Sequence, residues 1–110
     1  MEDKIKVKVE EIHEGIQNLK ERTDFDVLRH KERLWEVETG INKYRIGQQQ
    51  LDGLRHALSI FQETAGLTTE GADAYNETIW DANVGARGKS TTLDQLFDEL
   101  QQLVTEFYKK

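Results

Sequence analysis

The sequence predicts an all-α protein that forms a single domain over residues 1–110. Apolar residues recur three and four positions apart along most of the chain, which is the periodicity of helices that bury one stripe. The chain contains no proline, the residue that breaks helices. Charged residues make up 33% of it and hydrophobic residues 36%, a balance that suits amphipathic helices. We expect an elongated helical hairpin, or coiled coil, with one or two shorter helices packed on it.

The first helix is predicted from a single apolar seam. Its members are spaced four, three, four and three residues apart: Ile5, Val9, Ile12, Ile16 and Leu19. The start is ambiguous, because residues 4–9 also alternate strictly between lysine and apolar side chains, as in a strand. A lone strand has no partner in the rest of the chain, so we expect the helix to begin near Lys8, after extended or frayed residues. Thr23 and Asp24 are good N-caps for the next helix, which places the first break within residues 20–24.

A second, long helix is predicted from residue 24 to residue 65. Two apolar runs support it: Leu34, Val37, Ile41 and Tyr44, followed by Leu51, Leu54, Leu58, Phe61 and Ala65. A continuous helix of this length would be about 63 Å long. The two runs are out of phase, and Gly40, Gly47 and Gly53 lie around the slip. We therefore expect a kink or a tight helix crossing there, and a C-terminal cap at Gly66.

Two shorter elements are predicted in the remainder. Residues 68–70 begin a helix that carries Tyr75, Ile79 and Trp80, and a polar loop follows over residues 83–91. Thr92 and Gln95 have the spacing of a capping box and begin the final helix. The apolar face of that helix consists of Leu93, Leu96, Phe97, Leu100, Leu103, Val104 and Phe107.

The loop before the final helix reads NVGARGKST and ends like a nucleotide-binding P-loop. A P-loop needs glycine five positions before Gly88, where the backbone turns around the phosphates, and this chain has Asn83 there. A helical pattern precedes the loop in place of a buried strand, and too few residues follow it for a nucleotide-binding sheet. We predict a basic loop with a helix start after it and no nucleotide site. Arg87 and Lys89, beside that helix start, remain candidates for holding an anion.

The histidines do not form a recognisable metal site. His13 begins an H-E-x-x-H zinc pattern, but the fifth position is Gln17. Glu10 and His13 match half of the E-x-x-H di-iron signature, which needs a second such pair. His30 and His56 both lack a glutamate three residues earlier. We therefore predict no metal site and no cofactor.

Paired carboxylates are the strongest hint of catalysis, and they are weak. Residues 11–14 and 70–73 resemble the magnesium-binding pairs of all-helical nucleotide pyrophosphohydrolases, but they lie more than fifty residues apart instead of about one helix. Asp73, Glu77 and Asp81 form an acidic stripe at helical spacing, which a solvated face also explains. No serine or threonine pairs with a histidine in a triad order. We predict that the chain is not an enzyme, with a helical hydrolase using this stripe as an alternative.

Composition restricts the partners and the compartment. The net charge of −6 argues against a nucleic-acid partner, because phosphate backbones need a positive face. The absence of cysteine excludes disulfides and thiolate metal sites. No apolar run reaches the length of a membrane span, and the charged start has no signal-peptide core. We expect a cytoplasmic protein, or one exported without a cleaved signal peptide.

The remaining signal is a set of apolar side chains suited to helix packing. Trp35 and Trp80 stand among charged neighbours; both suit a core, and tryptophan is also enriched at interface hot spots. Amphipathic helices in so small a chain bury their seams against one another or against a second chain. The candidate partner-binding residues are Trp35, Leu51, Leu54, Leu58, Phe61, Trp80, Leu93, Phe97, Leu100 and Phe107.

Residues 5–65 also carry a family resemblance. The segment from Ile5 to Ile12, followed by Ile16 and Leu19, and the later apolar run from Leu34 to Phe61 look like the two helices of small type VII secretion proteins. These are the helical-hairpin proteins of the W-x-G family and the short helical partners of LXG toxins. The W-x-G turn itself is absent, since no tryptophan here has glycine two residues later. The resemblance implies a small helical protein that is exported or loaded as a dimer.

Together these observations predict a non-enzymatic protein–protein interaction module. The most concrete form is a small helical partner or chaperone for another protein, such as a type VII secretion cargo, acting as a homodimer or in a heteromeric complex. The stripes of residues 51–61 and 93–107 would bury against the partner, and charged flanks would select it. The alternative is a small phage or bacterial regulator that binds and inhibits a host protein. A filament or scaffold component is a further possibility.

Overall fold

The computed structural model describes residues 2–22, 31–47, 51–64 and 79–109. These residues form four α-helices: α1 (Glu2–Glu21), α2 (Lys31–Ile46), α3 (Asp52–Thr64) and α4 (Leu93–Tyr108). A short 3₁₀ turn, η2 (Ala86–Gly88), lies in the loop before α4. Within these ranges there is no β-strand, only one isolated bridge between Asn83 and Thr92. The predicted all-α class is confirmed.

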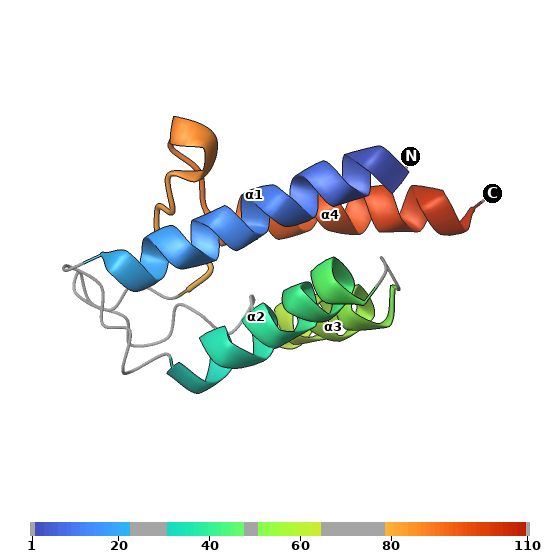
Figure 1. Cartoon of the computed structure of the whole chain (residues 1–110), viewed down its shortest axis with the longest axis horizontal. Coiled ribbons are helices and arrows are strands. Elements are labelled where there is room, and N and C mark those ends of the chain that lie inside the picture. Colours follow the sequence, from blue (N-terminus) through green and yellow to red (C-terminus); the bar gives the residue numbers. More distant parts are fainter. Residues whose placement is uncertain (1, 23–30, 48–50, 65–78, 110) are drawn as a thin grey trace.

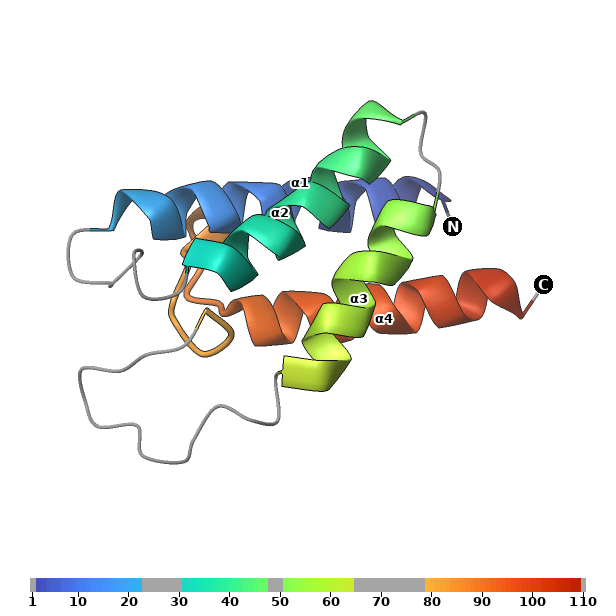
Figure 2. The same ribbon diagram turned by 90° about the horizontal axis from the view of Figure 1, so that it is seen from below.

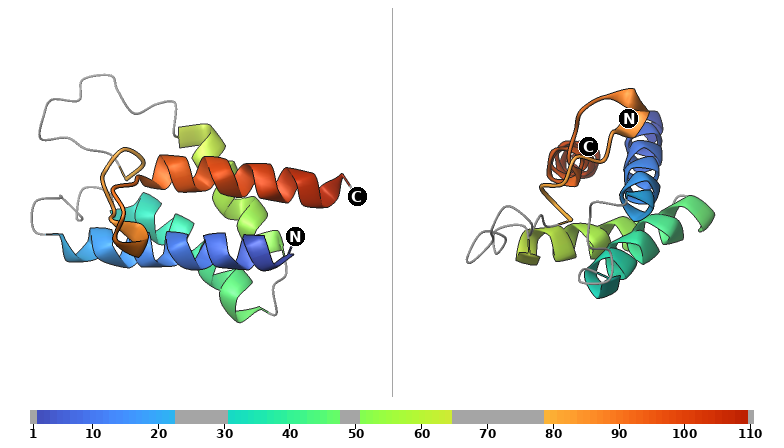
Figure 3. Two further views of the ribbon diagram at one scale, coloured as in Figure 1. Left: turned by 90° about the horizontal axis from the view of Figure 1, so that it is seen from above. Right: turned by 90° about the vertical axis from the view of Figure 1, so that its left-hand side faces the viewer.

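The helices are arranged in two layers. The first and last helices, α1 and α4, lie side by side and antiparallel, and α2 and α3 together cover one face of that pair (Figures 1 and 3). Seen from the side of the second layer, α2 runs obliquely across α1, and α3 crosses α4 (Figure 2). The molecule measures 43 × 26 × 22 Å. The predicted elongated hairpin is not confirmed, because α1 packs more extensively on α4 than on α2, the helix that follows it.

The core lies between the two layers and begins with the seam of α1. All five predicted seam residues, Ile5, Val9, Ile12, Ile16 and Leu19, are buried. Three aromatic rings from different segments form a cluster in another part of the core: Phe61 of α3, Trp80 of the turn before the loop, and Phe97 of α4. Their centroids are 5.1 to 5.6 Å apart, in edge-to-face and stacked geometries. This cluster joins the second layer to α4.

The start of α1 differs from the prediction. The helix begins at Glu2, not near Lys8. In a strand Ile5, Val7 and Val9 would share one face, but Ile5 and Val9 are buried here and Val7 is 54% exposed. A helix with 3.6 residues per turn places Val7 on the side opposite Ile5 and Val9, which agrees with this difference in exposure. Burial of Ile5 against the rest of the core therefore draws the first turn into the helix.

The predicted long helix is two helices. α2 ends at Ile46 and α3 begins at Asp52, and they pack against each other at Gly40 and Gly53. In a continuous helix these glycines would be about 20 Å apart. Here a Cβ atom built on Gly53 would lie 2.5 Å from the carbonyl oxygen of Gly40. The expectation of a tight helix crossing around these glycines is correct, and the expectation of a helix 63 Å long is wrong.

The predicted short helix from residue 68 falls mainly on residues outside the described ranges. Its last members that are described, Ile79 and Trp80, lie in a turn. The predicted capping box is present: the Thr92 side chain accepts a hydrogen bond from the Gln95 N–H, and the Gln95 side chain accepts one from the Thr92 N–H. α4 therefore starts where the sequence predicts.

Candidate functional site

The loop of residues 83–92 is folded against α1. The side chain of Asn83 accepts hydrogen bonds from the backbone N–H groups of Gly85 and Thr91, which closes the loop on itself. Asn18 of α1 donates to the Val84 carbonyl oxygen at 2.9 Å, and Val84 packs against Gly15. The asparagine that replaces the first P-loop glycine thus organises a loop that docks on a helix.

Arg87, a basic residue of this loop, already interacts with a carboxylate of the same chain. The backbone N–H of Arg87 donates to the Glu14 carboxylate at 2.6 Å, and the Arg87 side chain lies 4.0 Å from the same oxygen. The Glu14 carboxylate therefore already interacts with Arg87, one of the two residues predicted as candidates for holding an anion. Lys89 is exposed next to it.

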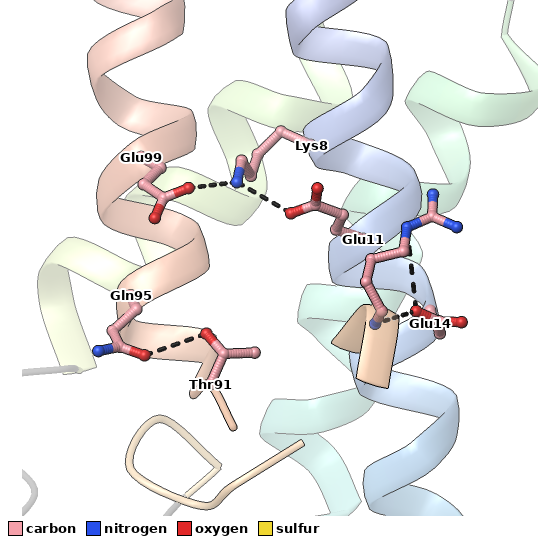
Figure 4. Close-up of polar contacts among 7 residues, drawn as sticks. Lys8, Glu11, Glu14, Thr91, Gln95 and Glu99 are labelled. Atoms are coloured by element: carbon pink, nitrogen blue, oxygen red, sulfur yellow. Dashed lines mark hydrogen bonds and ion pairs between the residues drawn. The ribbon is translucent and has the colours of Figure 1, made fainter. Parts of the chain in front are cut away.

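A polar cleft of about 200 Å³ lies between α1, α4 and the loop. Its inner cation, Lys8, donates a hydrogen bond to Glu11 at 2.9 Å and another to Glu99 across the gap between the helices (Figure 4). Burial lowers the pKa of Lys8, but the bonds to Glu99 and Glu11 outweigh it, so the pKa is raised. An ammonium held in this way joins α1 to α4 and is a poor general base or nucleophile.

The carboxylates in the described part of the chain do not gather into a metal site. No group of three histidine, aspartate or glutamate side chains that suits a metal ion occurs there. Asp81 of the predicted acidic stripe is exposed, while Asp73 and Glu77 lie outside the described ranges. Burial together with the negative charges of Asp98 and Asp81 raises the pKa of Asp94.

Most of the candidate partner-binding residues lie in the chain's own core. Helices of the same chain cover these side chains. The buried members are Leu54, Leu58, Phe61, Trp80, Leu93, Phe97 and Leu100, and Leu51 and Phe107 are partly buried against the same core. Trp35 is different: 65% of it is exposed to solvent.

Trp35 belongs to a face of α2 that points away from the core. Trp35, Thr39, Asn42 and Ile46 are spaced four, three and four residues apart, and we call them the outer face of α2. Ile46 is 80% exposed. The buried residues of the helix, Leu34, Val37, Gly40, Ile41 and Tyr44, lie on the opposite side. Sequence reasoning missed Ile46, because it breaks the buried spacing of α2 and only two members of its own stripe are apolar.

Two open depressions lie along the outer face of α2. A depression of about 400 Å³ surrounds Trp35 between Lys31, Glu32 and Glu36, and a second of about 390 Å³ lies at Ile46. Both are open and mainly apolar in lining.

Bonds to α1 hold the outer face in place. Arg45 donates to Glu10 of α1 at 3.0 Å and to Asn42 of the outer face at 3.1 Å. Nearer the start of α2, Glu38 accepts hydrogen bonds from Gln17 and Lys20 of α1. These contacts brace one flank of α2, the helix from which Trp35 and Ile46 project.

Comparison of the chain with protein-family models, with curated proteins and with solved structures found no match in any of the three. None of the described helices is both long and apolar enough to span a membrane.

Proposed function

We propose that this chain is a non-enzymatic protein–protein interaction module that binds a helical partner through the outer face of α2. The observation that carries the proposal is the exposure of Trp35 and Ile46 on a helix whose opposite face is buried. The other large apolar side chains predicted for binding are at least partly packed in the core.

The energetics of tryptophan burial support this surface. A tryptophan buries about 150–250 Å² in a contact, and the outer face already exposes most of Trp35. At roughly 25 cal/mol per Å², covering about 150 Å² contributes about 4 kcal/mol before the cost of association. Tryptophan is also the residue type most enriched at hot spots. Trp35 is therefore the anchor, and Ile46 extends the contact along the helix.

The form of the surface favours a helix as the partner element. A stripe with spacing four, three and four is the pattern by which two helices interdigitate over several turns. A small helical partner or chaperone, as the resemblance to type VII secretion proteins implies, would use such a stripe. The partner would supply apolar side chains for the depressions at Trp35 and Ile46.

Photo-crosslinking with matched charge substitutions tests the proposal. A benzoylphenylalanine at position 35 is expected to give a discrete cross-linked species in cells that make the protein. Trp35→Glu and Ile46→Glu are expected to remove the complex while far-UV circular dichroism and the urea midpoint stay unchanged. Val7→Glu is the control, because Val7 is also exposed, at 54%, but lies on α1. The proposal fails if Trp35→Glu associates as the wild type does, or if Val7→Glu is equally damaging.

A further inference from the structure

The charges beside the outer face of α2 are not symmetric along the helix. Acidic residues, Glu36 and Glu38, flank its first half, and basic residues, Lys43 and Arg45, flank its second half. Glu36 and Lys43 lie on one flank, with the helical spacing of seven residues that places them one above the other. Glu38 and Arg45 lie on the other flank, also seven residues apart.

The two flanks differ in what they already bind. Glu38 and Arg45 are engaged with α1, through Lys20 and Glu10 respectively. Glu36 and Lys43 are exposed, and neither side chain takes part in a hydrogen bond or ion pair found among the described residues. An acidic and a basic side chain are thus free on the same edge of the exposed stripe.

We infer that the partner of the outer face is a second copy of this chain, bound antiparallel about a two-fold axis that passes between Thr39 and Asn42. Reversing a second α2 against the first places Trp35 opposite the partner's Ile46, and Thr39 opposite the partner's Asn42. The same operation places Glu36 beside the partner's Lys43, and the two-fold axis repeats that pair. The surface is therefore complementary to itself in charge, and its two exposed apolar side chains meet across the contact. This inference rests on the proposed function, for which it names the partner.

The size of the contact sets its strength. α2 has 16 residues and is about 24 Å long. One face of such a helix buries less than the roughly 1,200 Å² of a stable specific interface. The dimer is consequently weak and concentration-dependent. The paired charges favour one relative orientation of the two helices and make the contact sensitive to salt.

Sedimentation velocity over a wide range of protein concentration tests the inference. The wild type is expected to move reversibly from monomer to dimer, and Trp35→Glu to stay monomeric. Glu36→Lys and Lys43→Glu each turn two attractive contacts into repulsive ones, so each is expected to weaken association about tenfold. The double variant Glu36→Lys/Lys43→Glu restores opposite charges and is expected to recover the affinity of the wild type.

The double variant also decides the orientation. In a parallel pair, Glu36 would face the partner's Lys31, and Lys43 would face the partner's Glu38. The double variant would then place like charges together at both points and would associate more weakly than either single variant. That result would overturn the antiparallel arrangement. A dimer that is insensitive to Trp35→Glu would also overturn the inference, because it would use another surface.

The two proposals fail in different ways. A wild-type chain that stays monomeric at every concentration refutes self-association. If that monomer still gives a position-35 cross-link to a different protein, the interaction function stands and only its partner changes. All substituted side chains are exposed, so an unchanged urea midpoint is expected for each variant and excludes unfolding as the cause.

Discussion

The contact between Gly40 and Gly53 is a severe steric constraint on this fold, and Gly53→Ala tests it. The new Cβ would lie 2.5 Å from the Gly40 oxygen, 2.7 Å from the Lys43 Cβ and 3.1 Å from the Tyr44 nitrogen. Ordinary contact begins at 3.4 Å, so α2 and α3 would have to separate by about 0.9 Å. The two atoms nearest the new Cβ are the Gly40 carbonyl oxygen and the Lys43 Cβ. Neither atom can move away by a side-chain rotation.

The magnitude follows from two opposing effects. Alanine is better than glycine in a helix by about 1 kcal/mol, whereas forcing an extra carbon into a packed contact costs about 1–3 kcal/mol and more against backbone. We expect a net loss of about 2 kcal/mol in the free energy of unfolding. For a chain of this size that loss lowers the Tm by roughly 8 °C.

Urea unfolding followed by far-UV circular dichroism measures this difference. Ser59→Ala is the matched control, because Ser59 is exposed on the same helix and gains helix propensity without a clash. That control is expected to gain a few tenths of a kcal/mol. If Gly53→Ala proved as stable as Ser59→Ala, the close approach of α2 to α3 would be refuted.

Three further substitutions test other parts of the fold. Thr92→Ala removes the capping box of α4 and is expected to cost about 1 kcal/mol in urea unfolding, whereas Thr92→Ser keeps the hydroxyl and most of the stability. Phe97→Ala removes a fully buried ring that contacts Phe61 and Trp80 and is expected to cost about 3–5 kcal/mol, enough to leave the chain partly unfolded in buffer; a loss under about 1 kcal/mol would contradict the aromatic cluster. Lys8→Met removes the ammonium between Glu11 and Glu99 and is expected to cost about 1 kcal/mol at neutral pH. Folding raises the pKa of Lys8 above 10.5, so its contribution is complete below pH 10.5 and is lost as pH rises through the higher folded value. The wild type and Lys8→Met should therefore converge in stability at high pH, and a constant gap would argue against the ion pairs.

The sequence patterns predicted local features well. The spacing from Ile5 to Leu19 identified every buried residue of the α1 seam, because a helix that buries one stripe has apolar residues three and four positions apart. Thr92 and Gln95 identified the start of α4, because capping depends on neighbours in sequence. The predicted helix from residue 68 lies mostly outside the described residues.

Features decided by distant contacts were harder to predict. Nothing between Ile46 and Leu51 except Gly47 marks the end of a helix, and glutamines favour its continuation. The helix is interrupted there, because Gly40 and Gly53 allow two separate helices, α2 and α3, to pack closely against each other. The proposed binding surface was hard to predict for a related reason: apolar spacing indicates burial, and the clearest spacings belong to the core. Trp35 was among the candidate residues, but only the structure distinguishes it from Trp80.

The pairing of α1 with α4 has a consequence for how the chain folds. α2 and α3 are neighbours in sequence and can close on each other after a short turn, whereas α1 meets α4 across residues 22–92. Contacts of such long range form late, because the intervening chain must first be brought together. During synthesis α1 emerges before α4, so its apolar seam stays incompletely covered until most of the chain has left the ribosome. A chaperone that shields Ile5 to Leu19 in that interval would act on folding itself, at a surface that the finished protein no longer exposes.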